Sequence, residues 1–109
     1  MTRHELTDDR VEDPADVAAA LGVSAVRIDI LRALREGPAT ISGVAAAVGY
    51  TRFGVREHLN MLERIGAVGY EIQRVPGSFR PARLYRIDAD RVEAIAWSLF
   101  DAITEHTWE

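Results

Sequence analysis

A short stretch of the sequence combines arginine, asparagine and phenylalanine at a spacing suited to reading a base pair. Arg52, Arg56 and Asn60 recur every fourth residue, and Phe53 follows the first of them. In an α-helix this spacing gathers the polar side chains on one face. A guanidinium can bind guanine O6 and N7 together, an asparagine can pair with adenine or a phosphate, and a phenylalanine can pack on a thymine methyl. The alternative for each is ordinary solvated surface.

The other face of the same predicted helix is apolar. Val55, Leu59 and Leu62 fall within about 60° of one another on a helical projection, which indicates a core-facing stripe. His58 borders this stripe, so we interpret it as a packed or capping histidine rather than a ligand or a catalytic base. A glycine inside a helix, such as Gly54, costs about 1 kcal/mol of stability relative to alanine. Its presence indicates that another backbone approaches the helix closely here, and we prefer a neighbouring helix to a DNA backbone.

A second basic group surrounds a turn-rich stretch. Arg74, Arg80 and Arg83 flank Pro76-Gly77-Ser78. Alternation before and after this turn predicts a β-hairpin whose second strand runs from Ala82 to Ile87. Its apolar area comes from Val68, Tyr70, Ile72, Leu84 and Ile87. A basic hairpin tip can lie along phosphates or place an arginine in the minor groove, and the alternative is a solvated loop.

Capping residues and glycines predict the helices that position these groups. Asp13 begins a short helix that Gly22 ends, Ser24 caps a second helix, and Thr40 caps a third. Thr40 leaves backbone N–H groups directed outward, a possible phosphate anchor. Thr51 caps a fourth helix that runs to Ile65, and only Gly49-Tyr50-Thr51 separates it from the third. Two short helices so closely joined and followed by a hairpin have helix-turn-helix spacing plus a wing.

The last predicted helix opens at Asp88 or Asp90 and reaches about Thr104. Its apolar stripe contains Val92, Ile95, Ala96, Leu99, Phe100 and Ile103, while Trp97 lies outside it. Two apolar faces predict two partners, the helix's own domain and a second subunit, against the alternative of a helix fully buried in its own domain. Asp101, Glu105 and His106 form an acidic helix end, which we prefer to a metal site bridging subunits.

Composition and charge restrict the class of protein. The 109 residues suit one domain, and the absence of cysteine excludes disulfides, zinc-thiolate sites, Fe–S clusters and thiol nucleophiles. No apolar run reaches the roughly 20 residues of a membrane span and no signal peptide is evident, so we expect a cytoplasmic protein. The net charge of −4, taken alone, argues against nucleic-acid binding. The charge is, however, distributed unevenly along the chain. Residues 50–87 carry seven arginines against three glutamates, +4, whereas both ends are acidic.

From about Ile28 to Ile87 the chain resembles the winged helix-turn-helix transcriptional regulators of ArsR and MarR type. The resemblance rests on ILRALREGPATISGVAAAVG, YTRFGVREHLNMLERIGAV and RPARLYRID, and covers a little over half the chain. It implies a dimer on a pseudo-palindromic operator, with the terminal helices at the interface. Metal-sensing ArsR relatives commonly use cysteine, so thiolate metal or arsenic sensing is excluded for this chain.

These observations together predict a mainly α fold with a small β-hairpin. We expect a flexible acidic tail over 1–12, a winged helix-turn-helix DNA-binding domain over 13–87 and a dimerisation helix over 88–106. The recognition helix is expected at about 52–65 and the wing at about 68–87. The predicted DNA-binding residues are Thr40, Thr51, Arg52, Phe53, Arg56, Asn60, Arg74, Arg80 and Arg83. The predicted dimer interface contains Val92, Ile95, Trp97, Leu99, Phe100 and Ile103.

The leading functional hypothesis is a homodimeric, sequence-specific repressor that binds double-stranded DNA, without cofactor, metal or enzymatic activity. Two alternatives stay open at this point. A winged helix can serve as a protein-interaction module, which Glu57 and Glu63 favour. A phage- or plasmid-type architectural or partition protein would bind DNA cooperatively over long stretches. The sequence does not indicate an operator or a small-molecule effector.

Overall fold

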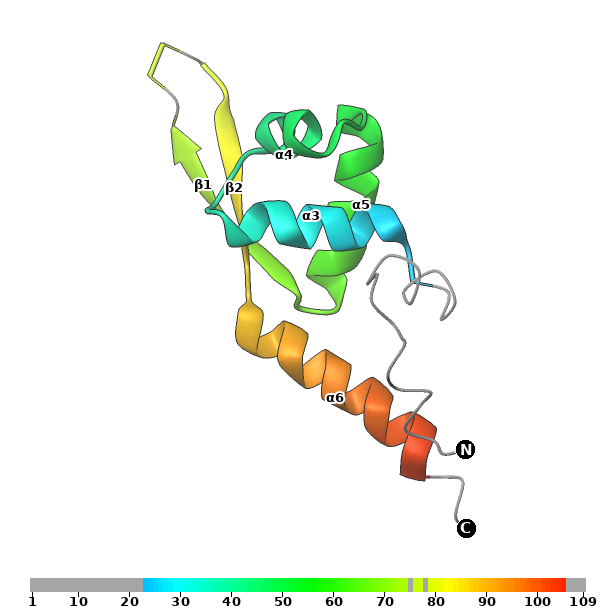
Figure 1. Cartoon of the computed structure of the whole chain (residues 1–109). Helices are drawn as coiled ribbons and strands as arrows, with labels where there is room; N and C mark the ends of the chain where they lie inside the picture. Colours follow the sequence, from blue (N-terminus) through cyan, green and yellow to red (C-terminus); the bar gives the residue numbers. More distant parts are fainter. Residues whose placement is uncertain (1–22, 75, 78, 106–109) are drawn as a thin grey trace.

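The computed structural model describes residues 23–74, 76–77 and 79–105, and over these ranges it contains four helices and one hairpin (Figure 1). The elements are α3 (Ala25–Arg35), α4 (Ile41–Val48), α5 (Arg52–Arg64), β1 (Val68–Arg74), β2 (Pro81–Ile87) and α6 (Ala89–Glu105). The predicted mainly α fold with a small β-hairpin is therefore confirmed. The acidic tail over 1–12 and the helix expected from Asp13 to Gly22 lie outside the described residues.

Side-chain caps begin α3, α4 and α5. Ser24, Thr40 and Thr51 each stand just before a helix, and each hydroxyl accepts a hydrogen bond from a backbone N–H three residues later, at 3.3, 3.1 and 3.0 Å. These bonds satisfy N–H groups that a helix cannot pair internally. Gly49 ends α4 with φ of 70°, a left-handed conformation that glycine adopts without strain. Residues 49–51 thereby turn the chain sharply from α4 into α5.

The hairpin is antiparallel and its register runs from Val68 opposite Ile87 to Arg74 opposite Pro81. The strand β2 begins one residue before the expected Ala82. A single bridge joins the hairpin to the loop between α3 and α4, because Ala39 and Tyr85 exchange both backbone hydrogen bonds, at 3.0 and 2.8 Å. This bridge holds β2 beside the start of α4.

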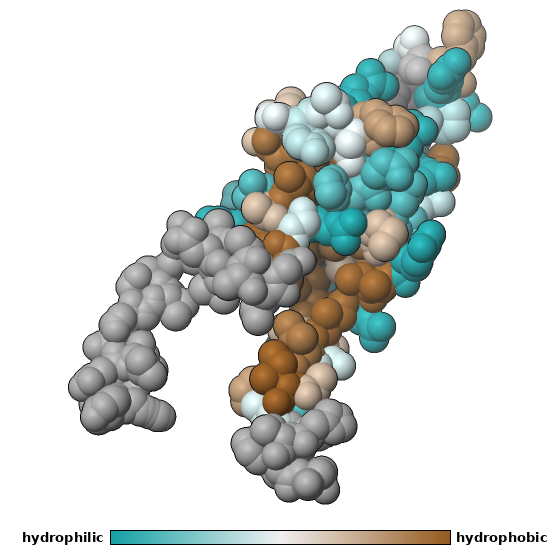
Figure 2. Space-filling view, turned by 90° about the vertical axis from the view of Figure 1, so that its right-hand side faces the viewer, coloured by the Kyte–Doolittle hydropathy of each residue, from teal (hydrophilic) through white to brown (hydrophobic). Residues whose placement is uncertain are grey.

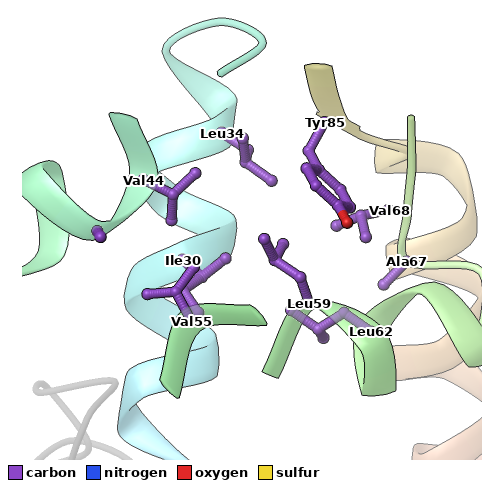
Figure 3. Close-up of a cluster of buried hydrophobic side chains, with 10 residues drawn as sticks. Ile30, Leu34, Val44, Val55, Leu59, Leu62, Ala67, Val68 and Tyr85 are labelled. Atoms are coloured by element: carbon purple, nitrogen blue, oxygen red, sulfur yellow. The ribbon is translucent and has the colours of Figure 1, made fainter. Parts of the chain in front are cut away.

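One apolar core joins the helices to the hairpin (Figure 3). Its buried members are Ile30, Leu34, Val44, Ala45, Val55, Leu59, Leu62, Ala67, Val68 and Tyr85. The apolar stripe predicted on α5 is confirmed, since Val55 and Leu59 are fully buried and Leu62 nearly so. Of the apolar residues predicted for the hairpin, Val68 is buried whereas Tyr70 and Ile72 are exposed, and Tyr85, which was not among them, fills the core. The bridge to Ala39 explains the burial of Tyr85, because it holds this part of β2 against the helices.

The helix α6 has two parts. At its start, the Asp88 carboxylate accepts from the Arg91 backbone N–H at 3.0 Å, and Arg91 Nε donates to the Ile65 carbonyl at 3.0 Å. Val92 and Ile95 pack against the core. The helix then continues away from the other helices (Figure 1), and Trp97, Leu99, Phe100 and Ile103 are exposed. A helix fully buried in its own domain is therefore excluded. Among the described residues no helix is long and apolar enough to cross a membrane.

Candidate DNA interface

An open groove of about 510 Å³ lies between the start of α4, the polar face of α5 and the beginning of β2. Its lining consists of Thr40, Ile41, Ser42, Arg52, Arg56, Asn60, Arg80, Pro81, Ala82 and Arg83. Six of these are predicted DNA-binding residues, and they come from three separate elements. The fold thus places side chains up to 43 positions apart in sequence around one concave, arginine-rich surface.

Helix periodicity explains the contribution of α5. Arg52, Arg56 and Asn60 are spaced four apart and are exposed on the side of the helix that faces the groove. The core residues Val55 and Leu59 occupy the opposite side. Burial of that apolar stripe fixes the rotation of α5 about its axis, so the core packing itself directs the arginines outward.

The α4 contribution is its N-terminus. Thr40 caps the helix, and the next two residues, Ile41 and Ser42, also line the groove. The first N–H groups of a helix carry partial positive charge and favour an anion. Ser42 was not among the predicted residues, although its place two positions after a capping threonine is a signal that the sequence contains.

Arg83 is held in place by two tyrosines of the hairpin. Its Nη1 donates to the Tyr85 hydroxyl at 3.2 Å, and its Cζ lies 4.4 Å from the centre of the Tyr70 ring. The hydrogen bond to Tyr85 is the main cause that raises the pKa of Arg83 above its ordinary value, and Tyr70 and Glu63 add to the effect. The guanidinium is therefore a fixed positive charge on the groove wall.

Three predicted residues do not line the groove. Thr51 caps α5, Phe53 is 73% exposed on its first turn, and Arg74 ends β1 at the far end of the hairpin. Phe53 and Arg74 therefore flank the groove and extend the surface that a long ligand can contact.

A second cluster, formed by Arg27, Tyr50 and His58, packs around the first turns of α5 and does not line the groove. Arg27 Nε donates to His58 Nδ1 at 3.0 Å, and the His58 and Tyr50 rings are 5.9 Å apart. The prediction of a packed histidine is confirmed. The close approach at Gly54 is different from expectation, because a Cβ there would lie 2.5 Å from the Tyr50 ring rather than against a neighbouring helix.

The described residues contain no group of three or more His, Cys, Asp or Glu side chains that could hold a metal ion. The acidic end of α6 supplies Asp101, and His106 lies outside the described residues. Nothing in the groove lining is a carboxylate, so its chemistry is that of hydrogen-bond donors and positive charge.

Comparisons with known proteins agree with this geometry. A family model described as a helix-turn-helix domain matches residues 23–69, which include α3, α4 and α5. A solved structure of a possible transcriptional regulator for arsenical resistance is 28% identical, with a TM-score of 0.58 and 85% of each chain covered. The chain is a winged helix-turn-helix transcriptional regulator.

Two further structures support the same fold for this regulator. The homodimeric winged helix-turn-helix DNA-binding domain of a possible ArsR-family regulator from Mycobacterium bovis is 26% identical, with a TM-score of 0.50, 87% of this chain covered and 82% of that one. A possible transcriptional regulator from Methanosarcina mazei Go1 is 13% identical, with a TM-score of 0.60 and 85% of each chain covered, and shows the fold alone. No curated protein sequence matches the chain. The regulator binds double-stranded DNA, as its helix-turn-helix domain indicates.

Proposed function

We propose that the regulator is a cytoplasmic homodimer that represses transcription by occupying a pseudo-palindromic operator. Two copies of α5 would enter successive major grooves, each with its hairpin alongside. Occupation of a promoter excludes polymerase, which is the simplest mechanism for a domain of this size.

The groove between α4, α5 and β2 carries the proposal. Arg52, Arg56 and Asn60 present donors along one helix face. Arg80, just before β2, and Arg83, within it, line the same groove. A DNA strand laid in the groove would have its phosphates between these two walls while α5 contacts the base edges. The start of α4, with Thr40, would hold a phosphate at the end of the groove.

Within this arrangement we assign a role to each kind of side chain. Arg52 and Arg56 bind guanine, Asn60 binds adenine or a phosphate, and Phe53 packs on a thymine methyl. Thr51 caps α5 and so keeps its first turn, which makes the base contacts, in a helical conformation. Arg74 and Arg80 bind phosphates along the hairpin.

The outer part of α6 supports the dimer. Its exposed apolar side chains include Leu99, Phe100 and Ile103, and they continue the face whose inner residues, Val92 and Ile95, pack on the core. Figure 2 shows this apolar surface extending down the helix. A second copy of α6 laid against it would bury surface that a monomer leaves in water, with Trp97 at the margin.

The decisive experiment is selection of binding sites from random duplexes, followed by footprinting and mobility shifts over about 50–200 mM salt. We expect a symmetric site with two half-sites. Arg56→Ala should weaken binding to the selected duplex by about 1–3 kcal/mol and relax its sequence preference, because a base contact is lost. Arg80→Ala should weaken binding to all duplexes alike and lower the salt slope by about 1, because a phosphate contact is lost.

Arg32→Ala is the matched control, since Arg32 is an exposed arginine of α3 that does not line the groove. It should bind as the parent does. Equal affinity of the Arg56→Ala variant and the parent for the selected duplex would contradict the role of α5. A footprint that spreads without limit would contradict an operator made of two half-sites.

A further inference from the structure

The tip of the hairpin holds an apolar side chain that the fold does not use. The paired strands end at Arg74 opposite Pro81, and Gly77 turns the chain between them with φ of 81°. Phe79 follows this turn and is 99% exposed, more than any other large hydrophobic side chain in the described part of the protein. The loop that carries it stands clear of the helices (Figure 1). Complete exposure of a phenylalanine is unfavourable in water, so a binding partner gains by covering it.

The neighbours of Phe79 indicate what that partner is. Arg80, the next residue, lines the groove, while Arg74 closes the other strand of the hairpin. A surface that places an aromatic ring between cations fits a ligand that has apolar faces between anionic chains. Stacked base pairs between phosphate backbones have this composition, and the groove already binds the same duplex.

The length of the hairpin determines which part of the duplex the ring meets. Each strand has seven residues and at about 3.3 Å per residue is about 20 Å long, and its outer half, beyond the buried Tyr85, extends past the core. With α5 in a major groove, this reach carries the tip past one phosphate strand. The adjacent minor groove, about 6 Å wide, lies on the other side of that strand.

We propose that Phe79 inserts into the minor groove next to the major groove that α5 occupies, where it wedges between two base pairs and bends the duplex. The proposal rests on the DNA binding through α5 proposed above. Apolar wedges of this kind, phenylalanine among them, partly unstack a base step and bend DNA towards the major groove. Pyrimidine–purine steps such as TA and CA unstack most readily, so Phe79 also contributes sequence preference without a hydrogen bond to a base.

Phe79→Ala and Phe79→Leu, measured on the highest-affinity duplex from the random-sequence selection, test the proposal. We expect the alanine variant to bind about 10-fold more weakly and the leucine variant to stay close to the parent, because leucine is also an apolar wedge. The distance between fluorophores at the two duplex ends reports bending. It should shorten with the parent and the leucine variant, and much less with the alanine variant.

2-Aminopurine placed at successive positions of the same duplex locates the wedge. Its fluorescence should rise at one step outside the region that α5 protects, and the rise should vanish with Phe79→Ala while the salt slope stays unchanged. Ile65→Ala, which truncates an exposed apolar residue at the other end of the reading helix, is the control and should match the parent.

Each other outcome is decisive. If Phe79→Ala binds and bends the selected duplex as the parent does, the ring has another partner, such as a protein, and the wedge is disproved while DNA binding stands. If the aminopurine signal persists without the ring, the wedge is equally disproved. If the selection yields no duplex at all, the proposed operator binding fails first, and this failure is distinguishable from that of the wedge.

Discussion

Tyr85 shows how one residue links folding to the proposed DNA interface. Its ring is fully buried in the core, while its hydroxyl accepts a hydrogen bond from Arg83 at 3.2 Å. The Tyr70 ring, whose centroid is 5.3 Å from that of Tyr85, packs against the face of the same guanidinium. The hydrophobic core therefore orients a charged group of the groove, and Arg83 loses less conformational entropy on binding a phosphate than a freely moving arginine would.

Tyr85→Phe should separate these two roles. The ring still fills the core, so we expect the free energy of unfolding to change by no more than about 1 kcal/mol in urea denaturation. Loss of the hydroxyl frees Arg83, and affinity for the selected duplex should fall by about 2- to 10-fold. Tyr70→Phe keeps its ring under Arg83 and is the matched control, expected to bind as the parent does. An unchanged affinity for Tyr85→Phe would show that Arg83 needs no anchor.

Among the elements, the turn between α4 and α5 sets the position of α5, the proposed recognition helix. Gly49 makes the turn, Thr51 caps α5, and Tyr50 lies between them with its ring over Gly54. The ring also contacts His58, which Arg27 holds from α3. Residues of α3, of the turn between α4 and α5 and of α5 thus meet beside the first turns of α5, the part of the helix that reaches the base edges in such motifs.

Gly54→Ala should reveal the contact between position 54 and the Tyr50 ring as a coupling energy in the stability of the protein. Alanine favours a helix over glycine by about 1 kcal/mol, but its Cβ would lie 2.5 Å from the Tyr50 ring. We expect Gly54→Ala alone to lower the free energy of unfolding. In a Tyr50→Ala background the same substitution should raise it, and the double-mutant cycle should give a coupling of about 1 kcal/mol or more.

Urea denaturation of the four proteins of the cycle measures this coupling. If Gly54→Ala has the same effect in both backgrounds, the ring of Tyr50 moves aside at no cost. The glycine would then have no packing role in the turn.

At the scale of the whole molecule, the charge is separated along its length. Residues 50–87, with α5 and the hairpin, carry a net charge of +4, whereas residues 88–105 of the α6 segment carry five acids and one arginine. The hairpin tip and the outer end of α6 lie at opposite ends of the described structure (Figure 1). The net charge of −4 is thus compatible with DNA binding, because in the proposed complex the acidic end lies far from the phosphates and helps to orient the approach.

Phe100→Asp should test the proposed dimer. The Phe100 ring is half exposed in the single chain and packs edge-on against Trp97, with ring centroids 5.5 Å apart. A carboxylate buried there in a dimer would be costly, so we expect the dimer dissociation constant to rise at least about 100-fold. Sedimentation velocity should show the monomer, with the hairpin and α3–α5 still folded by circular dichroism.

Ser98→Asp adds the same charge on the polar side of α6 and should remain dimeric. Binding of Phe100→Asp to the full operator should fall to that of a single half-site, because the link between the two reading helices is lost. A Phe100→Asp protein that still sediments as a dimer would place the interface elsewhere.

Local patterns in the sequence determined most of the elements. Ser24, Thr40 and Thr51 begin helices because their side chains bond backbone groups only three residues away. The stripe of Val55, Leu59 and Leu62 indicates the buried face of α5 because helix periodicity is a property of the chain itself. These short-range effects also predicted the polar face with Arg52, Arg56 and Asn60.

Only the tertiary structure decided how these elements meet. Pairing of β2 with β1 and with Ala39 buries Tyr85 and leaves Ile72 exposed, a choice that alternation along one strand cannot make. The groove that joins Arg56 to Arg83, and the Tyr50 ring over Gly54, are likewise contacts between segments. Their geometry depends on the packing of the whole core, whereas capping and periodicity depend on neighbours a few residues apart.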